Sequence, residues 1–305
     1  MLINRFHYLF ERSHAYAIGD VLGFKLEAQG LEIEIGIKPV GGVYIHEEII
    51  PRMLDQLILD MKQNAEVRNP IVVDRNTSVV LDGMHRVAAI KKLGCRYLPA
   101  CLVDYRSPRI QVGCWYRVVQ DWVSDARLLN IFISLGLSVE PSSFDSALNE
   151  LEARRATAAL FTARNCHLIR APKTDIVESY RWVKRFESIA EEQGLHIGYE
   201  MEHDAEWQVR SGKCSAALLV PRTTKDEVIR TALSGMVFTH KTTRHILPAR
   251  PVNVNVPLDW LMGEKPMEEV ERLLVEYLSG KKVMRLSKGS FYDGRRYDEE
   301  LLVFR

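Results

Sequence analysis

The segment Asp82-Gly83-Met84-His85-Arg86 combines several groups that bind phosphate, and it falls between a predicted strand and a predicted helix. Gly83 lets the backbone approach a ligand closely, and the first N–H groups of a helix, aided by its dipole, favour anions. His85 adds a donor, and Arg86 can bind a phosphate through two hydrogen bonds. Asp82 could hold a metal or accept a proton. The alternative is a structural turn in which Asp82 caps the helix and Arg86 lies in solvent.

A second cluster is Lys241-Thr242-Thr243-Arg244-His245, which brings two cations, two hydroxyls and an imidazole together. Such a density of donors fits a pocket for an anion or for the carboxylate of an amino acid. The alternative is a solvated basic loop, which has the same composition. The cluster is therefore a candidate binding segment for a small anionic or zwitterionic ligand.

The third candidate is His46-Glu47-Glu48, at the start of a predicted helix. Acidic residues in that position stabilise the helix dipole, which is the structural explanation for them. The functional hypothesis makes one carboxylate a general base. It requires that the carboxylate face the segment around Asp82.

Trp115, within Cys114-Trp115-Tyr116, is the fourth candidate and lies close to a predicted domain boundary. An aromatic side chain at such a place usually belongs to the core. The alternative is that Trp115 forms a wall of a small-molecule cleft between two domains, where ligand sites often occur.

Hydrophobic periodicity predicts the elements that must position these groups. In the first part of the chain it predicts strands over Leu31–Ile37 and Ala100–Val103, a hairpin of Ile71–Val73 and Val79–Leu81, and helices over Glu47–Asn64 and Val87–Leu93, the second of which Gly94 closes. From about Asp121 helices and strands alternate, which favours a layered α/β structure. The later predicted elements are Phe144–Arg155, Asn165–Arg170, Lys173–Gln193, Ser215–Val220 and Thr224–Leu233, with Thr223 or Thr224 as the cap of the last helix.

Length and composition limit the classes of protein that are possible. The 305 residues predict two domains at roughly 150 residues each, and we expect them to be 1–118 and 119–305, the second with a C-terminal extension. The formal charge of +1 argues against a dedicated nucleic-acid binder. Five cysteines without a CxxC pair predict reduced thiols in a cytoplasmic protein. We expect neither a signal peptide nor a membrane span.

The stretch from Ile71 to Gly94 resembles the signature of the ParB/sulfiredoxin superfamily. Sulfiredoxins place their catalytic cysteine between the glycine and the histidine of this motif, where this chain carries Met84. That difference excludes sulfiredoxin chemistry at this position. ParB partition proteins carry a GERR-like box and a downstream helix-turn-helix, and the sequence contains neither.

Three features, in the same order, resemble the free-serine kinases of archaea and the related kinases of siderophore pathways. They are a glutamate ahead of the first long helix, the Asp-Gly-x-His-Arg motif, and the segment KTTRHILP at Lys241–Pro248. The resemblance implies phosphoryl transfer from ATP or ADP, with Mg²⁺, to the hydroxyl of free L-serine, which gives O-phospho-L-serine. It also implies an α/β (α+β) fold in which a ParB/sulfiredoxin-like nucleotide-binding domain packs against a substrate-binding α/β domain, with the active site in the cleft.

The resemblance also implies a role for each candidate residue. Glu47 would take the hydroxyl proton, and Asp82 would be the second catalytic carboxylate, near Mg²⁺ and the transferred phosphate. Residues Gly83–Arg86 would hold the nucleotide phosphates, with His85 counted among the catalytic residues. Trp115 and Lys241–His245 would hold serine and its new phosphate.

Two positions depart from the family pattern. Met84 stands where the kinases often have a second histidine, so a backbone N–H would have to replace one side-chain donor. Asp60 stands where the archaeal enzyme has a small hydroxyl residue, which leaves homoserine, threonine or another small hydroxylated substrate open. The rival hypothesis is a ParB-like regulator that binds nucleotide without transferring phosphate. The sequence predicts no membrane partner and no oligomeric state.

Overall fold

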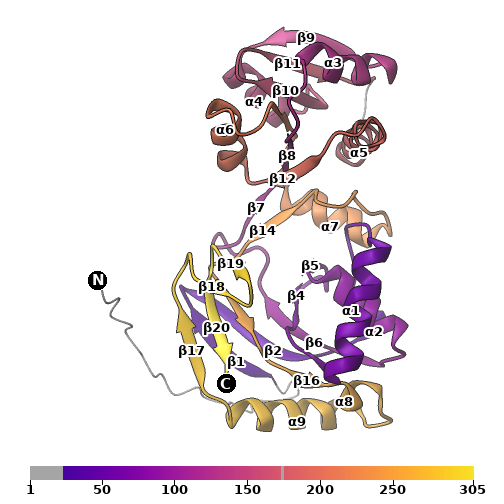
Figure 1. Ribbon diagram of the computed structural model, residues 1–305. Coiled ribbons are helices and arrows are strands. Elements are labelled where there is room, and N and C mark those ends of the chain that lie inside the picture. Colours follow the sequence, from indigo (N-terminus) through magenta and orange to yellow (C-terminus); the bar gives the residue numbers. More distant parts are fainter. Residues whose placement is uncertain (1–22, 173–174) are drawn as a thin grey trace, which may run out of the picture. The chain divides into compact units, whose positions relative to one another are not determined.

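The computed structural model describes residues 23–172 and 175–305, which form two units of mixed helix and strand (Figure 1). Unit 1 combines the chain up to Gln111 with the segment His245–Arg305, and unit 2 is Val112–Arg244. The chain passes from unit 1 to unit 2 within the short strand β7 (Gln111–Gly113) and returns to unit 1 within the short strand β14 (Arg244–Ile246). The N-terminal stretch in which no signal peptide is predicted lies outside the described residues, as do Lys173 and Thr174 of the helix predicted over Lys173–Gln193.

Unit 1 contains a five-stranded sheet in the order β1-β2-β6-β4-β5. Only the pair β4 and β6 is parallel, and the other pairs are antiparallel. The predicted hairpin is confirmed as β4 and β5, and β5 ends at Asp82. The bounds of the strands are β1 (Phe24–Ala28), β2 (Leu31–Pro39), β4 (Ile71–Asp74), β5 (Val80–Asp82) and β6 (Tyr97–Val103).

Two helices of unit 1 lie next to the candidate site. The helix α2 (Met84–Lys92) follows β5 after a single residue and begins three residues earlier than the predicted Val87. Gly94 comes after its end with φ +77°, as the sequence predicts. The helix α1 (Pro51–Asn64) begins four residues later than predicted, because Pro51 fits the first turn and biases the residue before it toward extended backbone. Glu47 and Glu48 therefore precede α1, so the helix dipole does not explain them.

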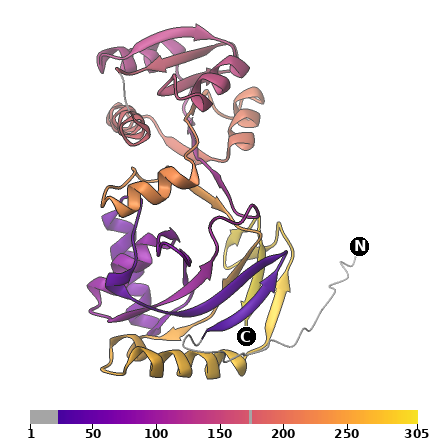
Figure 2. The same ribbon diagram turned by 180° about the vertical axis from the view of Figure 1, so that it is seen from behind.

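The C-terminal segment completes unit 1, which corrects the expected division at residue 118. Val270, Leu274 and Leu278 of α9 (Met267–Ser279) are fully buried in the same core as Ile35 and Leu98 of the five-stranded sheet. Figures 1 and 2 show α9 running along the side of β1 and β2. The other elements here are η1 (Val40–Gly42), β3 (Glu66–Val67), β15 (Ala249–Val252), β16 (Val256–Pro257), α8 (Leu258–Met262), β17 (Val283–Leu286), β18 (Phe291–Tyr292), β19 (Arg295–Arg296) and β20 (Glu300–Phe304).

Unit 2 contains a six-stranded sheet in the order β12-β8-β13-β10-β11-β9, and every neighbouring pair is antiparallel. Helices and strands alternate along the chain, as predicted, and Thr224 caps α7 in a capping box with Glu227. The bounds are β8 (Tyr116–Val119), α3 (Asp125–Ser134), β9 (Ser138–Ser142), α4 (Phe144–Glu152), β10 (Ala158–Thr162), β11 (Cys166–Arg170), α5 (Ile176–Glu192), β12 (Ile197–Glu200), α6 (Glu202–Arg210), β13 (Ala216–Leu219) and α7 (Lys225–Leu233).

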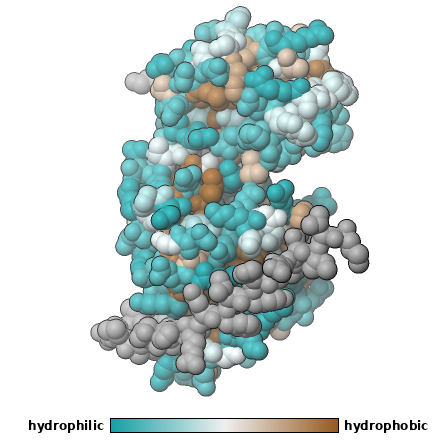
Figure 3. All heavy atoms as spheres, turned by 90° about the vertical axis from the view of Figure 1, so that its left-hand side faces the viewer, coloured by the Kyte–Doolittle hydropathy of each residue, from teal (hydrophilic) through white to brown (hydrophobic). Residues whose placement is uncertain are grey.

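The surface and the thiols agree with the composition. On the face drawn in Figure 3, hydrophilic residues predominate and apolar residues form only small patches. Among the described residues, no helix has the length and apolar character that a bilayer span requires. All five cysteines are buried and free, which confirms that the chain has no disulfide framework.

Candidate active site

The junction of β5 and α2 in unit 1 carries the candidate phosphate-binding residues. Gly83 joins the two elements with φ +97°, a left-handed conformation that favours glycine. A Cβ added there would meet the Arg86 guanidinium at 2.6 Å and Ile71 at 2.8 Å. No side chain caps α2, so its N-terminus remains available to an anion. Only glycine leaves room for the close backbone approach that the sequence predicts.

Asp82 accepts hydrogen bonds from two arginines. Arg86 Nη2 lies 2.7 Å and Arg250 Nη1 lies 2.5 Å from the same oxygen, Asp82 Oδ2, and Arg250 Nε also donates to Glu299 at 2.7 Å. The alternative in which Asp82 caps the helix and Arg86 lies in solvent is therefore wrong. The Arg86 side chain is only 18% exposed, and its Nε is buried without a hydrogen-bond partner. The site thus presents one carboxylate and two guanidinium groups.

The two guanidinium groups decide the ionisation state of Asp82. Burial raises the pKa of the Asp82 carboxyl, but the charges of Arg250 and Arg86 and their hydrogen bonds outweigh it and hold the pKa well below its usual range. Asp82 is therefore ionised at neutral pH. A general base needs a pKa near the working pH. Asp82 suits the orientation of cations better than it suits proton transfer.

Glu47 follows a segment that runs beside β5. Tyr44 pairs with Val79 in a parallel bridge, and Val80 N–H donates to the Tyr44 carbonyl at 2.8 Å. His46, two residues after Tyr44, contacts the Val80 carbonyl through its ring Nδ1 at 2.8 Å. Glu47, the next residue, is buried, with 7% of its surface exposed. The carboxylate that the sequence marks as a base thus belongs to the same unit as the phosphate-binding groups and directly follows a residue that contacts β5.

His85 and Met84 occupy the first turn of α2. His85 Nε2 accepts a hydrogen bond at 2.9 Å from the N–H of Ile50, the residue that precedes α1. Because Nε2 accepts, the ring proton resides on Nδ1, which is a donor. The Met84 side chain packs against the apolar core, so only its backbone can face an anion. His85 thereby fixes the segment that carries Glu47 to the helix that carries Arg86.

The imidazole rings of His46 and His245 contact each other close to Asp82. The His46 ring is fully buried and contacts the Val80 carbonyl through Nδ1 at 2.8 Å, and its centroid is 5.3 Å from that of His245. His245 Nε2 lies 2.8 Å from the Tyr105 hydroxyl. His245 therefore belongs to unit 1, whereas the other four residues of its sequence cluster belong to unit 2.

Burial of His46 predicts a stability effect. Burial lowers the pKa of His46 to about 4, against the opposing effects of its bond to Val80 and the charge of Asp82. The unfolded imidazole protonates near pH 6.5 and the native one does not, so stability falls as the pH falls from 6.5 toward 4. We expect His46→Asn, which keeps a donor for the Val80 carbonyl, to lose less stability in acid. Between pH 7.5 and pH 5 its free energy of unfolding should fall by about 2 kcal/mol less than that of the wild type.

Urea unfolding of both proteins at pH 7.5 and pH 5 measures this difference. His245 provides the internal comparison, because burial together with the nearby His46 and Arg250 lowers its pKa well below the usual value despite the charge of Asp82. The variant should therefore keep part of the acid sensitivity. Equal losses of stability in wild type and variant between the two pH values would contradict the assignment.

Unit 2 contains the other group of residues that the sequence marks as candidates. Trp115 Nε1 donates to the Thr243 carbonyl at 3.2 Å, and the Lys241 ammonium lies 4.5 Å from the centre of the Trp115 ring. Arg244 Nη2 lies 3.3 Å from Glu202, and its Nε is buried without a hydrogen-bond partner. The structure therefore brings Trp115 together with the 241–244 segment.

Thr242 has a structural role within this segment. Its side chain is fully buried, and its hydroxyl donates to the Thr239 carbonyl at 2.8 Å. The Thr242 hydroxyl therefore closes the turn, which leaves its backbone as the part that could face a ligand. Lys241, Thr243 and Arg244 are the neighbouring candidates for side-chain contact.

Two features of the site change the sequence interpretation. Arg250 was not among the predicted residues, because no local motif marks a lone arginine that folds back onto a strand 168 positions earlier. Asp60, which raised the question of another substrate, lies on the exposed side of α1 and hydrogen-bonds Asn64. It is nine positions from Pro51, the first residue of α1, or roughly 14 Å along the helix.

The donor set around Asp82 does not form a preformed metal cage. Among the described residues, no group of three or more His, Cys, Asp or Glu side chains converges as metal ligands would. Magnesium in nucleotide sites commonly uses one or two carboxylates and completes its shell with phosphates and water. Asp82, whose side chain is 42% exposed and whose Oδ2 takes both arginines, fits that limited role through Oδ1.

Comparison with known proteins places the chain among kinases. No protein-family model matches it. It is 30% identical over 224 residues to an ATP-dependent L-serine kinase of Staphylothermus marinus, across 71% of this chain and 86% of that protein. It is 24% identical over 225 residues to an ADP-dependent L-serine kinase of Thermococcus kodakarensis, across 71% and 88%. A solved free serine kinase in complex with AMP matches the fold with a TM-score of 0.65 at 23% identity, over 74% of this chain and 93% of that one.

Proposed function

Because the chain belongs to the free L-serine kinase family, we propose that it transfers the terminal phosphoryl group of ATP or ADP to the hydroxyl of a small amino acid, with free L-serine as the first candidate. The product would be O-phospho-L-serine. The observation that carries the proposal is that unit 1 combines the uncapped N-terminus of α2 with the Arg86–Asp82–Arg250 cluster, and that the buried Glu47 closely follows a segment bridged to the β5 side of the hairpin. Each of these parts matches one requirement of phosphoryl transfer.

Phosphoryl transfer depends mostly on positioning and on charge neutralisation. The backbone N–H groups at the start of α2 and the guanidinium groups of Arg86 and Arg250 would bind the phosphate oxygens. Asp82 keeps both guanidinium groups aimed at one point, and its low pKa keeps it ionised while it does so. These groups oppose the negative charge that builds on the oxygens of the transferred phosphoryl group and of the leaving nucleotide.

Glu47 supplies the base. It would take the proton from the acceptor hydroxyl as that oxygen forms a bond to the terminal phosphorus. The bond between this phosphorus and the bridging oxygen breaks, and the electron pair leaves with ADP from ATP or with AMP from ADP. Asp82 is less suited to this step, because Arg250 and Arg86 hold the pKa of its carboxyl well below the usual range.

Magnesium is part of the proposal in a limited way. Bound to the nucleotide phosphates, Mg²⁺ would neutralise further charge on the transferred group. Asp82 Oδ1 is the protein atom that we assign to it. The acceptor would be held in unit 2, where the Trp115 ring and Lys241 offer an apolar wall and a cation for its carboxylate.

Phosphorus NMR tests the proposed function. Purified protein is incubated with Mg²⁺ and with ATP or ADP in separate reactions, each with L-serine, L-homoserine or L-threonine. We expect the O-phospho-L-serine resonance to grow as the nucleotide is consumed. Nucleotide binding by calorimetry without a new phosphoester in any reaction would instead support the ParB-like regulator.

A further inference from the structure

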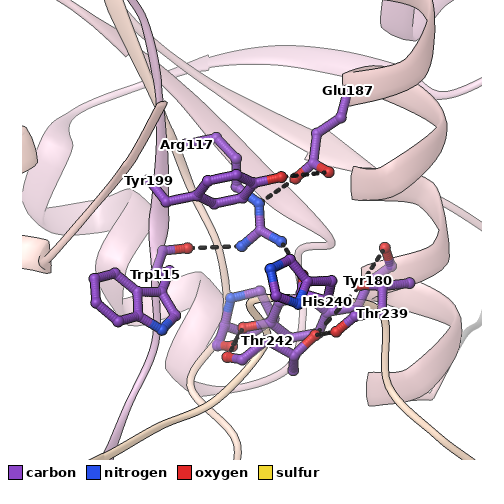
Figure 4. Close-up of polar contacts among 9 residues, drawn as sticks. Trp115, Arg117, Tyr180, Glu187, Tyr199, Thr239, His240 and Thr242 are labelled. Atoms are coloured by element: carbon purple, nitrogen blue, oxygen red, sulfur yellow. Dashed lines mark hydrogen bonds and ion pairs between the residues drawn. The ribbon is translucent and has the colours of Figure 1, made fainter. Parts of the chain in front are cut away.

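Arg117 is the largest fully buried side chain in the described residues, although arginine is rarely buried. It lies on β8, two positions after Trp115. Its Nε forms a hydrogen-bonded ion pair with Glu187 of α5 (Figure 4). No local sequence pattern marks either residue, because the two partners of the ion pair are 70 positions apart.

The other two nitrogens of Arg117 bind backbone on both sides of the candidate acceptor site. Nη1 donates to the Trp115 carbonyl at 2.6 Å, and Nη2 donates to the His240 carbonyl at 3.5 Å (Figure 4). Trp115 forms the aromatic wall, and His240 immediately precedes Lys241. One planar group therefore joins the strand that carries the wall to the turn that carries the cation.

Two tyrosines hold the guanidinium group in its plane. Its carbon lies 5.5 Å from the centre of the Tyr180 ring and 5.4 Å from that of the Tyr199 ring. The Tyr199 hydroxyl donates to the second oxygen of Glu187 at 3.3 Å. With its ion pair, its two carbonyl bonds and its two aromatic neighbours, Arg117 can adopt only one orientation.

The same tyrosine also lies close to the turn. The Tyr180 hydroxyl donates to the Pro221 carbonyl at 2.8 Å and lies 3.3 Å from the Thr242 carbonyl, and the Thr242 hydroxyl donates to the Thr239 carbonyl at 2.8 Å. Lys241, inside this turn, has φ +61°, a conformation that a residue other than glycine keeps only when its surroundings enforce it. The turn thus holds Lys241 over Trp115 at a cost in backbone strain.

Stability alone does not account for this arrangement. A buried ion pair often stabilises a protein no better than apolar residues of the same volume would. Arginine differs from lysine and from apolar residues because its rigid fork can donate in several fixed directions at once. Here those directions end on Glu187 and on the two carbonyls that flank the acceptor site.

We propose that Arg117, oriented by Glu187, is a positioning residue that sets the distance between Trp115 and the 240–243 turn and so determines affinity for the amino acid that is phosphorylated. The effect on affinity for the amino acid rests on the proposed function. The effect on the distance between Trp115 and the turn concerns unit 2 alone and can be tested in the absence of any reaction.

Three variants separate positioning from charge and from folding. Arg117→Lys keeps the charge beside Glu187 but loses the fork. The double variant Arg117→Met with Glu187→Met removes the pair without leaving a buried charge unpaired. Arg170→Met is the control, because Arg170 also pairs with glutamates in unit 2, Glu140 and Glu150, but makes no contact with Trp115. Circular dichroism and thermal melting establish that each variant is folded.

The first readout is the ¹⁹F NMR resonance of Trp115 in protein labelled with 5-fluorotryptophan, assigned by its loss in Trp115→Phe. We expect the resonance to shift or broaden in both Arg117 variants and to stay in place in Arg170→Met. A Trp115 resonance that is unchanged in both Arg117 variants overturns the proposal, whether or not the protein transfers phosphate.

The second readout is steady-state kinetics with L-serine and nucleotide varied separately. Loss of ground-state positioning should raise KM for L-serine by about 10- to 100-fold and leave kcat and the nucleotide KM within about threefold. Equal changes in both KM values, or a fall in kcat alone, would overturn the assignment to the acceptor side. Absence of turnover in the wild type would count against the proposed function, and the Trp115 resonance would still decide whether Arg117 positions the site.

Discussion

Replacing Glu47 with Gln is expected to lower kcat by between about a hundred- and ten-thousand-fold, the range that removal of a general base usually produces. The substitution keeps the size of the side chain and its ability to accept a hydrogen bond, so the fold should persist. Nucleotide affinity should change little, because Glu47 acts on the acceptor hydroxyl and not on the phosphates. Initial rates measure kcat, and calorimetry measures nucleotide binding.

Glu48→Gln is the matched control for this prediction. Glu48 is the next residue along the chain and also precedes α1, but it is more exposed than the buried Glu47. We expect the control to keep kcat within about threefold of the wild type. If Glu47→Gln is fully active, or if both variants lose activity equally, Glu47 is not the base.

The second large effect is expected for Asp82→Asn. The neutral amide cannot hold Arg86 and Arg250 as the carboxylate does, so turnover should fall by about a hundred-fold or more, as when one preorganised electrostatic contact is lost. Removal of the negative charge leaves two guanidinium groups without their common anion. Nucleotide binding should therefore be retained or become tighter while turnover is lost.

Asp60→Asn provides the comparison for Asp82→Asn, since Asp60 is an exposed carboxylate of the same unit that lies away from the site. Its turnover and its preference for L-serine should match the wild type. Calorimetry with ADP tests whether Asp82 acts by orienting Arg86 and Arg250 or by contributing directly to nucleotide affinity. Weaker binding of ADP together with loss of turnover would show that Asp82 contributes to nucleotide affinity and would contradict the role given to the two arginines.

Much of the local structure could be predicted from the sequence, because its signals lie within a few residues. The alternating apolar residues of Leu31–Ile37, the turn between β4 and β5, and the glycine after α2 are all confirmed. The start of α1 was wrong by four residues, since the apolar stripe continues into a segment that Pro51 keeps extended. Periodicity gives the face of a helix better than it gives the first turn.

Long-range relations could not be read in the same way. The return of residues 245–305 to unit 1 depends on burial of α9 against β2. The apolar periodicity within α9 predicts that one face is buried but not which strand it packs against. The same holds for Arg250 with Asp82 and for Arg117 with Glu187. In each case a charged residue that is unremarkable in the sequence acquires its role from a partner far along the chain.

The division of unit 1 into two stretches of sequence has a consequence for how the protein forms during synthesis. Unit 2 is continuous, so it can fold as soon as Arg244 has left the ribosome. Unit 1 must wait for Glu300–Phe304, because β20 pairs with both β15 and β17 and Phe304 is fully buried in the core. The usual order, in which the N-terminal domain folds first, is therefore reversed. Until synthesis reaches α9, the side of the five-stranded sheet that this helix covers stays exposed and open to chaperones.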